Sequence, residues 1–247
     1  MKYIEDFAYK RIFDFNYIIK LTGNKDLASN IVQSYLAKGY IKRIKRNLYA
    51  AVSFETKGII PTKFEIASKI TKNSFISYRS AFEFYGYTNQ VYNEVIVSSP
   101  IQFHDFTFEH NTYRSKRVKD TLFVDKINNV KVSSLEKTIV DSIDNVKTYD
   151  DFEELISALN MIPLLNGKEI LKYLKHVNKT ILYSKVGLVL SFYEDGYNIT
   201  EAMLAEMKKC GSQIARNFTS EKHRLSIYYP EWKLHAYDIT KIKEGVF

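Results

Sequence analysis

Residues 25–38 carry the clearest periodic pattern of apolar and polar positions in the chain. At 100° per residue, the pattern predicts a helix with one apolar face, formed by Leu27, Ala28, Ile31, Val32, Tyr35 and Leu36. The opposite face carries Asp26, Ser29, Asn30, Gln33 and Ala37. Asn24 is a suitable N-cap for this helix, and Gly39 is a suitable end.

The residues around this helix predict a small domain. A shorter helix is expected between Asp14 and Gly23, and "KYIEDFAYKRIF" upstream can supply one more. Residues 40–44 and 48–52 are expected to be strands, joined by a tight turn at "KRN". Three helices followed by a hairpin are the order of a winged helix-turn-helix, whose recognition helix enters the major groove. We therefore expect residues 1–57 to be a DNA-binding domain.

The formal net charge of +8 supports this expectation, because most of it lies near the N-terminus. Residues 1–50 hold ten Lys/Arg and four Asp/Glu, whereas the other 197 residues hold 26 and 24. A concentrated basic region is typical of proteins that bind nucleic acid or an acidic membrane surface. The alternative is a solvated charged face without a partner.

Two kinds of DNA contact are expected. Ser, Asn and Gln on the outer face of the third helix can hydrogen-bond to base edges, and hairpin cations can displace phosphate counterions. The predicted DNA-binding residues are Lys25, Ser29, Asn30, Gln33, Lys42, Arg43, Lys45, Arg46 and Asn47. Ile44, Leu48 and Tyr49 are expected to pack the hairpin onto the helices.

The sequence pattern of residues 58–247 predicts a second, larger domain of the α+β class. Strands are expected in 93–99, 103–114 and 130–132, and a strand-like tail in 223–239. Helices are expected in 148–160, 167–177, 181–195 and 201–209. Ser77 and Gly86 are suitable ends for a helix through "YRSAFEFY". Ser133 and Glu136 have the spacing of a capping box, which accounts for Glu136 without catalysis.

Three stretches resemble one family. "GYIKRIKRNLY" is similar to the end of the N-terminal winged helix of AbiEi-type antitoxins, with Asn47 in place of the turn glycine. "ISYRSAFEFYGY", residues 76–87, and "VKVSSLEKTIVDSID", residues 130–144, resemble two further blocks of that family in the same order. The resemblance covers most of residues 15–145. The C-terminal hundred residues match only in general character.

The resemblance implies an antitoxin of a bacterial toxin–antitoxin system that acts in abortive infection, a form of phage defence. Such a protein represses its own operon by binding inverted repeats in promoter DNA. Its C-terminal domain counteracts a co-encoded nucleotidyltransferase toxin without a stable complex. The alternative is a plain winged-helix transcription regulator whose larger domain binds a ligand or a partner.

A second basic stretch, "RSKRVK", stands out from the nearly neutral remainder of the chain. Its four cations are Arg114, Lys116, Arg117 and Lys119. They are a candidate second polyanion contact or antitoxic surface. The other interpretation is a solvated hairpin end or sheet edge, where Lys and Arg discourage strand pairing.

Enzyme chemistry is not expected. The sequence has no Walker A motif, no G-x-S-x-G and no paired-Cys zinc spacing. His104 and His110 share a face of the expected strands, but nothing nearby completes a metal site. The nearest enzymatic alternative is a DNA nuclease using the Glu231-x-Lys233 spacing on a strand, and its Pro-Asp partner is missing. We expect no catalytic residue, metal or cofactor, and we expect Trp232 to be a core residue.

The location expected from the sequence is the cytoplasm. One cysteine, Cys210, cannot form an intramolecular disulfide, which fits a reducing compartment. The longest apolar run, 186–193, is far shorter than the roughly 20 residues of a membrane helix. No signal peptide is expected at the N-terminus, because acidic residues follow "MKYI" at once. No membrane partner is expected either.

Overall fold

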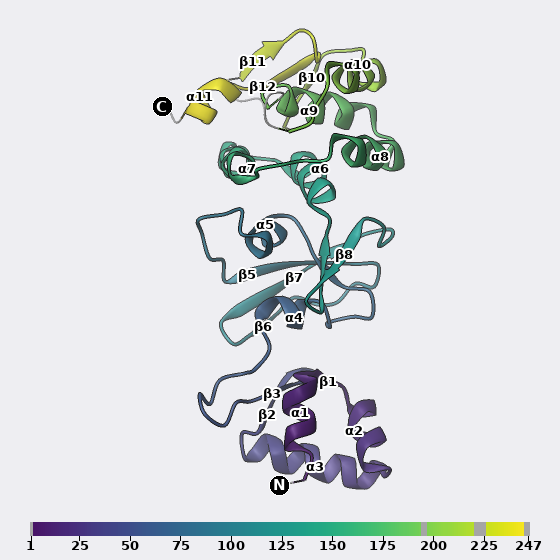
Figure 1. Cartoon of the computed structure of the whole chain (residues 1–247), viewed down its shortest axis with the longest axis vertical. Coiled ribbons are helices and arrows are strands. Elements are labelled where there is room, and N and C mark those ends of the chain that lie inside the picture. The colour runs from purple at the N-terminus through teal and green to yellow at the C-terminus, as the bar shows by residue number, and fades with distance from the viewer. Residues whose placement is uncertain (1, 194–196, 220–225, 245–247) are drawn as a thin grey trace. The chain divides into compact units, whose positions relative to one another are not determined.

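A computed structural model describes residues 2–193, 197–219 and 226–244 of the chain (Figure 1). The described residues form a mixed α+β fold with eleven helices and three β-sheets, which confirms the expected class. By their internal contacts they divide into two compact units. Unit 1 comprises residues 1–76, 93–121 and 126–132, and unit 2 comprises residues 77–92, 122–125 and 133–247. No helix in the described part of the chain has the length and hydropathy of a membrane span.

The first part of unit 1 combines three helices with a three-stranded sheet (Figure 1). Its elements are α1 (Ile4–Lys10), β1 (Ile12–Phe13), α2 (Phe15–Thr22), α3 (Lys25–Ala37), β2 (Ile41–Lys45) and β3 (Leu48–Ala51). The strand order is β1-β3-β2, and both pairings are antiparallel. The predicted second and third helices and the hairpin are confirmed. Strand β1 was not predicted, because two residues are too few to show an alternating pattern.

An aromatic core holds these elements together. Phe7 of α1 stacks on Phe13 of β1 at 4.4 Å between ring centroids, and Tyr35 of α3 meets Phe7 edge-on at 5.8 Å. Ala28, Val32 and Tyr35 form the buried stripe of α3. Leu27, predicted to be buried, is 43% exposed. It lies about 100° around the helix from the centre of that stripe, so it falls at the boundary with solvent.

A six-stranded sheet follows. Its strands are β4 (Phe75–Ile76), β5 (Glu94–Ser99), β6 (Phe106–Phe108), β7 (Asn111–Arg117), β8 (Val124–Ile127) and β9 (Val130–Ser133). Their order is β6-β7-β5-β4-β9-β8, with β5 parallel to β7 and β4 parallel to β9. The short helix α4 (Lys63–Ala67) packs against β4 and β5. The expected strands correspond to β5, to the β6–β7 hairpin and to β9.

Unit 2 is mainly helical. Its helices are α5 (Arg79–Tyr85), α6 (Leu135–Asn145), α7 (Tyr149–Met161), α8 (Gly167–Val177), α9 (Thr180–Leu190), α10 (Glu201–Cys210) and α11 (Ile239–Glu244). Its small sheet consists of β10 (Arg216–Asn217), β11 (Ser226–Tyr229) and β12 (Leu234–Tyr237), with β12 in the centre. Residues 182–190 of α9 are all buried, and Trp232 is buried as expected.

The predicted bounds of α5, α7, α8 and α10 lie within one residue of the observed ones. Helix α9 ends at Leu190, whereas the predicted end at residue 195 lies outside the described residues, and helix α11 was not predicted. The first residues of the expected strand-like tail, 223–225, also lie outside them. The tail then forms β11 and β12, and the chain turns into helix α11 at Ile239.

Two predicted N-caps are wrong. Helix α6 is capped by Ser134, whose hydroxyl accepts the N–H of Lys137, because Ser133 is the last residue of strand β9. Glu136 instead accepts the backbone N–H of Asn166, at the start of α8. Helix α5 begins after Tyr78, which has φ 54° and makes no capping hydrogen bond, so Ser77 is not its cap. Its end at Gly86, with φ 81°, agrees with the prediction.

Candidate nucleic-acid interface

Beyond its first turn, helix α3 presents an uncharged polar surface to solvent. The Asn24 side chain accepts the N–H groups of Asp26 and Leu27, which fixes the start of the helix. The helix packs against α2 and β2 through its buried stripe. Asn30 and Gln33 are exposed, as is Lys25 in the first turn, and Ser29 is half-buried. Side chains of this kind can donate and accept hydrogen bonds at base edges.

The β2–β3 hairpin is anchored through Asn47 at its turn. Asn47 has φ 62°, the left-handed conformation expected for it. Its Oδ1 accepts the backbone N–H of Phe15 at 3.0 Å, which ties the turn to the start of α2. Ile44, Leu48 and Tyr49 are buried as predicted. Asn47 is therefore already in use as a structural residue, and a DNA contact by its side chain stays a prediction.

The four hairpin cations have different surroundings. Arg43 and Arg46 are exposed, and Arg43 lies over the ring of Tyr49 at 5.9 Å. Lys42 Nζ forms an ion pair with Glu109 of unit 1 at 2.6 Å. Lys45 Nζ lies 5.7 Å from the centre of the Phe103 ring, and burial lowers its pKa. The alternation is shifted by an irregularity between Arg43 and Lys45, which leaves the two arginines as the exposed pair.

The charges of the chain separate by unit rather than at residue 57. Unit 1 holds 20 Lys/Arg and 10 Asp/Glu, and unit 2 holds 16 and 18. Their formal charges are +10 and −2, which together give the chain's +8. Residues 58–76, 93–121 and 126–132, which carry α4 and most of the six-stranded sheet, thus belong to the basic unit. A boundary between residues 57 and 58 stays a prediction.

The second basic stretch is divided between the two faces of β7. Arg114 and Lys116 alternate with Ser115 and Arg117 along the strand. Arg114 forms ion pairs with Glu94 at 2.8 Å and with Asp105 at 3.1 Å, and these raise its pKa. Arg117 and Lys119 are exposed, at the end of the strand and just beyond it. Because β7 lies between β6 and β5, it is an inner strand and not the sheet edge considered from the sequence.

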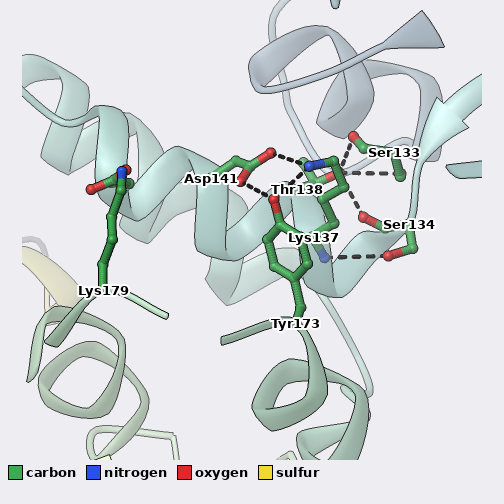
Figure 2. A network of polar contacts seen from close by, with 8 residues as sticks. Ser133, Ser134, Lys137, Thr138, Asp141, Tyr173 and Lys179 are labelled. Carbon is green, nitrogen blue, oxygen red and sulfur yellow. Dashed lines mark hydrogen bonds and ion pairs between the residues drawn. The ribbon is translucent and has the colours of Figure 1, made fainter. Parts of the chain in front are cut away.

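The third stretch of the resemblance forms a buried polar network in unit 2 (Figure 2). Lys137 Nζ lies 2.9 Å from Asp141 Oδ2 and 2.5 Å from the hydroxyl of Tyr173, which donates to Asp141 Oδ1 at 2.7 Å. Lys137 is 6% exposed. Thr138 shares a hydrogen bond of 2.7 Å with Ser133. These contacts join α6 to α8 and to the end of β9, which gives the stretch a structural explanation.

The nuclease alternative has little support in the geometry. Residues 231–233 lie in the turn between β11 and β12, not on a strand as that alternative requires. Glu231 forms an ion pair with Lys208, and Lys233 has φ 52°. Within the described residues, no group of three or more His, Cys, Asp or Glu is arranged to hold a metal ion.

Sequence reasoning missed the two partners that hold hairpin lysines, Glu109 and Phe103. It also missed four lysines that the six-stranded sheet brings to the same end as Arg117, namely Lys69, Lys72, Lys126 and Lys131. Glu109 and His110 have positive φ values of 46° and 65°, which mark the tight β6–β7 turn. Adjacent polar residues between two strand-like runs are the available signal for such a turn.

Comparison with known proteins shows the fold alone. No family model matches the chain, and no curated protein matches it. Among solved structures, the crystal structure of the RV2827C protein from Mycobacterium tuberculosis is similar, with a TM-score of 0.68 at 10% sequence identity. The match covers 98% of this chain and 92% of that one. The chain therefore shares its mixed α+β architecture with a solved protein over nearly its whole length.

Proposed function

We propose that this protein is a sequence-specific DNA-binding repressor of its own operon, in which residues 1–57 form a winged helix-turn-helix. The observation that carries the proposal is the exposed surface of α3 and the β2–β3 hairpin. It combines hydrogen-bonding side chains at Asn30 and Gln33 with exposed cations at Arg43 and Arg46. In this arrangement α3 is the recognition helix, and the hairpin is the wing that contacts phosphates.

The order of elements supports the proposal. The sheet order β1-β3-β2 places the hairpin beside a short strand that follows α1, and α2 and α3 lie between them in the chain. Helix α3 packs on α2 through its buried stripe, so its polar side is left for a ligand. The charge of +10 on unit 1 favours a polyanionic ligand.

We further propose that the protein is the antitoxin of a toxin–antitoxin pair and works in the cytoplasm without catalysis. This part rests on the resemblance to AbiEi-type antitoxins in three stretches of the chain. The predicted opponent is a nucleotidyltransferase toxin encoded next to it, which is counteracted without a stable complex. The second candidate function, a plain winged-helix regulator, shares the DNA surface and lacks the toxin.

Two experiments separate these functions. The first measures binding of the full chain to a duplex from its own promoter and to a scrambled duplex, by fluorescence anisotropy. We expect the promoter duplex to bind at least tenfold more tightly, since specific sites commonly exceed non-specific DNA by far more. Equal affinities would exclude a sequence-specific repressor.

The second experiment scores growth of cells that express the neighbouring toxin candidate with or without this chain. Restored growth is the result expected of an antitoxin. A variant with Asn30→Ala and Gln33→Ala should still restore growth, because neutralisation is assigned to the larger domain. If the chain binds its promoter but never restores growth, the plain regulator is the better description.

A further inference from the structure

One end of the six-stranded sheet collects cations from four separate segments of unit 1. Strands β5 and β7 end together there, because Ser99 is the register partner of Arg117. Strand β4 begins at the same end, since Phe75 pairs with Ser98. Strand β9 runs parallel to β4, so its first residues lie there too. Strand β8 neighbours β9 in the sheet, and the charge of its Lys126 acts on Lys131 of β9. The cations of the segment before β4, the end of β7, β8 and the start of β9 are Lys69, Lys72, Arg117, Lys119, Lys126 and Lys131, and we name them the sheet-end cluster.

Hydrogen bonds fix the segments of the sheet-end cluster to one another. The hydroxyl of Thr71 lies 2.8 Å from that of Ser99, which joins the segment before β4 to the end of β5. Lys131 donates its backbone N–H to Ser68 Oγ at 2.8 Å and its Nζ to the carbonyl of Lys72 at 2.5 Å. The sheet and these hydrogen bonds therefore set where the backbone segments that carry the cations lie.

The sheet-end cluster has six cations, and two acids adjoin them in the chain, Asp120 after Lys119 and Asp125 before Lys126. Beyond residue 57, the segments of unit 1 hold nine Lys/Arg and five Asp/Glu. Four of these acids pair with cations outside the cluster, namely Glu65 with Arg11, Glu94 and Asp105 with Arg114, and Glu109 with Lys42.

The cations of the cluster also repel one another. Burial lowers the pKa of Lys131, and the charges of Lys69 and Lys126 lower it further. The repulsion between like charges held this close together is relieved by a bound polyanion.

We propose that the sheet-end cluster is a second phosphate-backbone contact for duplex DNA, beside the site bound by α3 and the β2–β3 hairpin. This inference rests on the proposed function. Both surfaces belong to unit 1, which holds the whole basic excess of the chain. Cations from several strand ends suit the spaced phosphates of a duplex, where each neutralised phosphate releases counterion.

The sheet gives the spacing between the two contacts. Glu109, which binds the hairpin residue Lys42, lies two residues before the start of β7, and Arg117 is the last residue of that strand. A seven-residue strand spans roughly 20 Å at about 3.3 Å per residue. At about 3.4 Å per base pair this equals roughly six base pairs of duplex. A duplex that ends at the hairpin contact is therefore too short to reach the cluster.

The test uses the full chain and two promoter duplexes, one limited to the central site and one extended by about ten base pairs on each side. The cluster variant carries Lys69→Ala, Arg117→Ala and Lys126→Ala, all at exposed positions. The control carries Lys147→Ala, Lys168→Ala and Lys209→Ala, at exposed positions of unit 2. Both variants lose three charges, so a general effect of net charge is matched.

We expect the cluster variant to lose the extra salt dependence that the unmodified chain gains on the extended duplex. For the unmodified chain and the control, extension should steepen the log–log salt slope by about 0.9 per added phosphate contact, or roughly 2 to 3 in all. The cluster variant should bind the short duplex as the unmodified chain does and gain little from the extension. Lys126→Glu alone, at an exposed position of β8, should lose part of the gain and serves if the triple variant has a lowered Tm.

Three results would overturn the inference. One is an undiminished gain from extension in the cluster variant, while the short duplex is still bound. Another is a cluster variant that loses binding to a labelled single-stranded RNA but keeps the gain on DNA, which would assign the cluster to RNA. Failure of the unmodified chain to bind either duplex would remove the proposed function itself, and the inference with it.

Discussion

At the residue scale, Gly187 is the position where a single added atom has the largest expected effect. It lies in α9, and a Cβ added there would be 2.0 Å from Cζ3 of the buried Trp232. Gly187→Ala should lower the free energy of unfolding by about 1–3 kcal/mol, because the ring and the helix must move apart.

Urea unfolding measures this effect, with Gly58→Ala as the matched control. A Cβ at Gly58 would meet Thr56 Oγ1 at 3.6 Å, which is ordinary contact. Equal midpoints for the two variants would contradict the packing described for Trp232. The sequence predicted Trp232 as a core residue but gave no sign of its partner, since the two residues are 45 positions apart.

Single residues were best predicted where the interaction is local. Asp14 and Asn24 cap their helices as expected, because a cap acts within three residues of itself. Ser133 was assigned the wrong role because the competing partner, strand β4, is more than fifty residues away. The ion pair between Lys42 and Glu109 lies beyond sequence reasoning for the same reason.

At the scale of elements, the account assigns base reading to α3 and positioning to the hairpin. Asn30→Ala or Gln33→Ala should weaken binding to the cognate duplex by about 1–3 kcal/mol and should hardly change binding to random DNA. Anisotropy titrations on both duplexes measure the difference. The controls are Asn89→Ala and Gln90→Ala, the same two residue types at exposed positions of unit 2. Equal losses on both duplexes would show that α3 does not read bases.

Elements were predictable in proportion to their length and periodicity. Helix α3 and the long helices α7 and α8 have clear apolar faces, so their bounds follow from the sequence. Strands β1, β4 and β10 have two residues each and depend on distant partners. The sheet-end cluster could not be assembled from the sequence, because its lysines come together only through the strand order β7-β5-β4-β9.

At the scale of the whole molecule, buried tyrosines in unit 2 predict a loss of stability in alkaline solution. Burial raises the pKa of Tyr197 to about 12, and burial likewise raises the pKa values of Tyr78, Tyr85 and Tyr193. A raised pKa means that the folded state keeps its proton where the unfolded state loses it. This stabilisation is complete below pH 10 and is lost as the pH rises toward the folded-state pKa values.

The free energy of unfolding should therefore fall between pH 10 and pH 12, by about 1.4 kcal/mol per pH unit for each tyrosine that stays protonated only when folded. Urea midpoints at pH 9, 10.5 and 11.5 measure the fall, and Tyr197→Phe should show a smaller one. A parallel decline for Tyr197→Phe and the unmodified chain would exclude Tyr197 as a contributor.

The distribution of charge is the whole-molecule feature on which the functional account depends. The sequence located the basic excess in the first fifth of the chain, and the structure extends the basic body to the six-stranded sheet. This result depends on which segments of the chain fold into unit 1, and no local sequence pattern indicates that. The similarity to a solved structure at 10% sequence identity supports the fold and does not identify functional residues.

The salt dependence of promoter binding shows whether the basic hairpin beside α3 binds DNA phosphates. The log–log slope is measured for the full chain and for a variant with Arg43→Ala and Arg46→Ala. At about 0.9 per phosphate contact, the account predicts a slope flattened by roughly 1.8, and no change for Lys147→Ala with Lys168→Ala. An unchanged slope in the Arg43→Ala, Arg46→Ala variant would contradict the account, because the exposed arginines would then lie outside the interface.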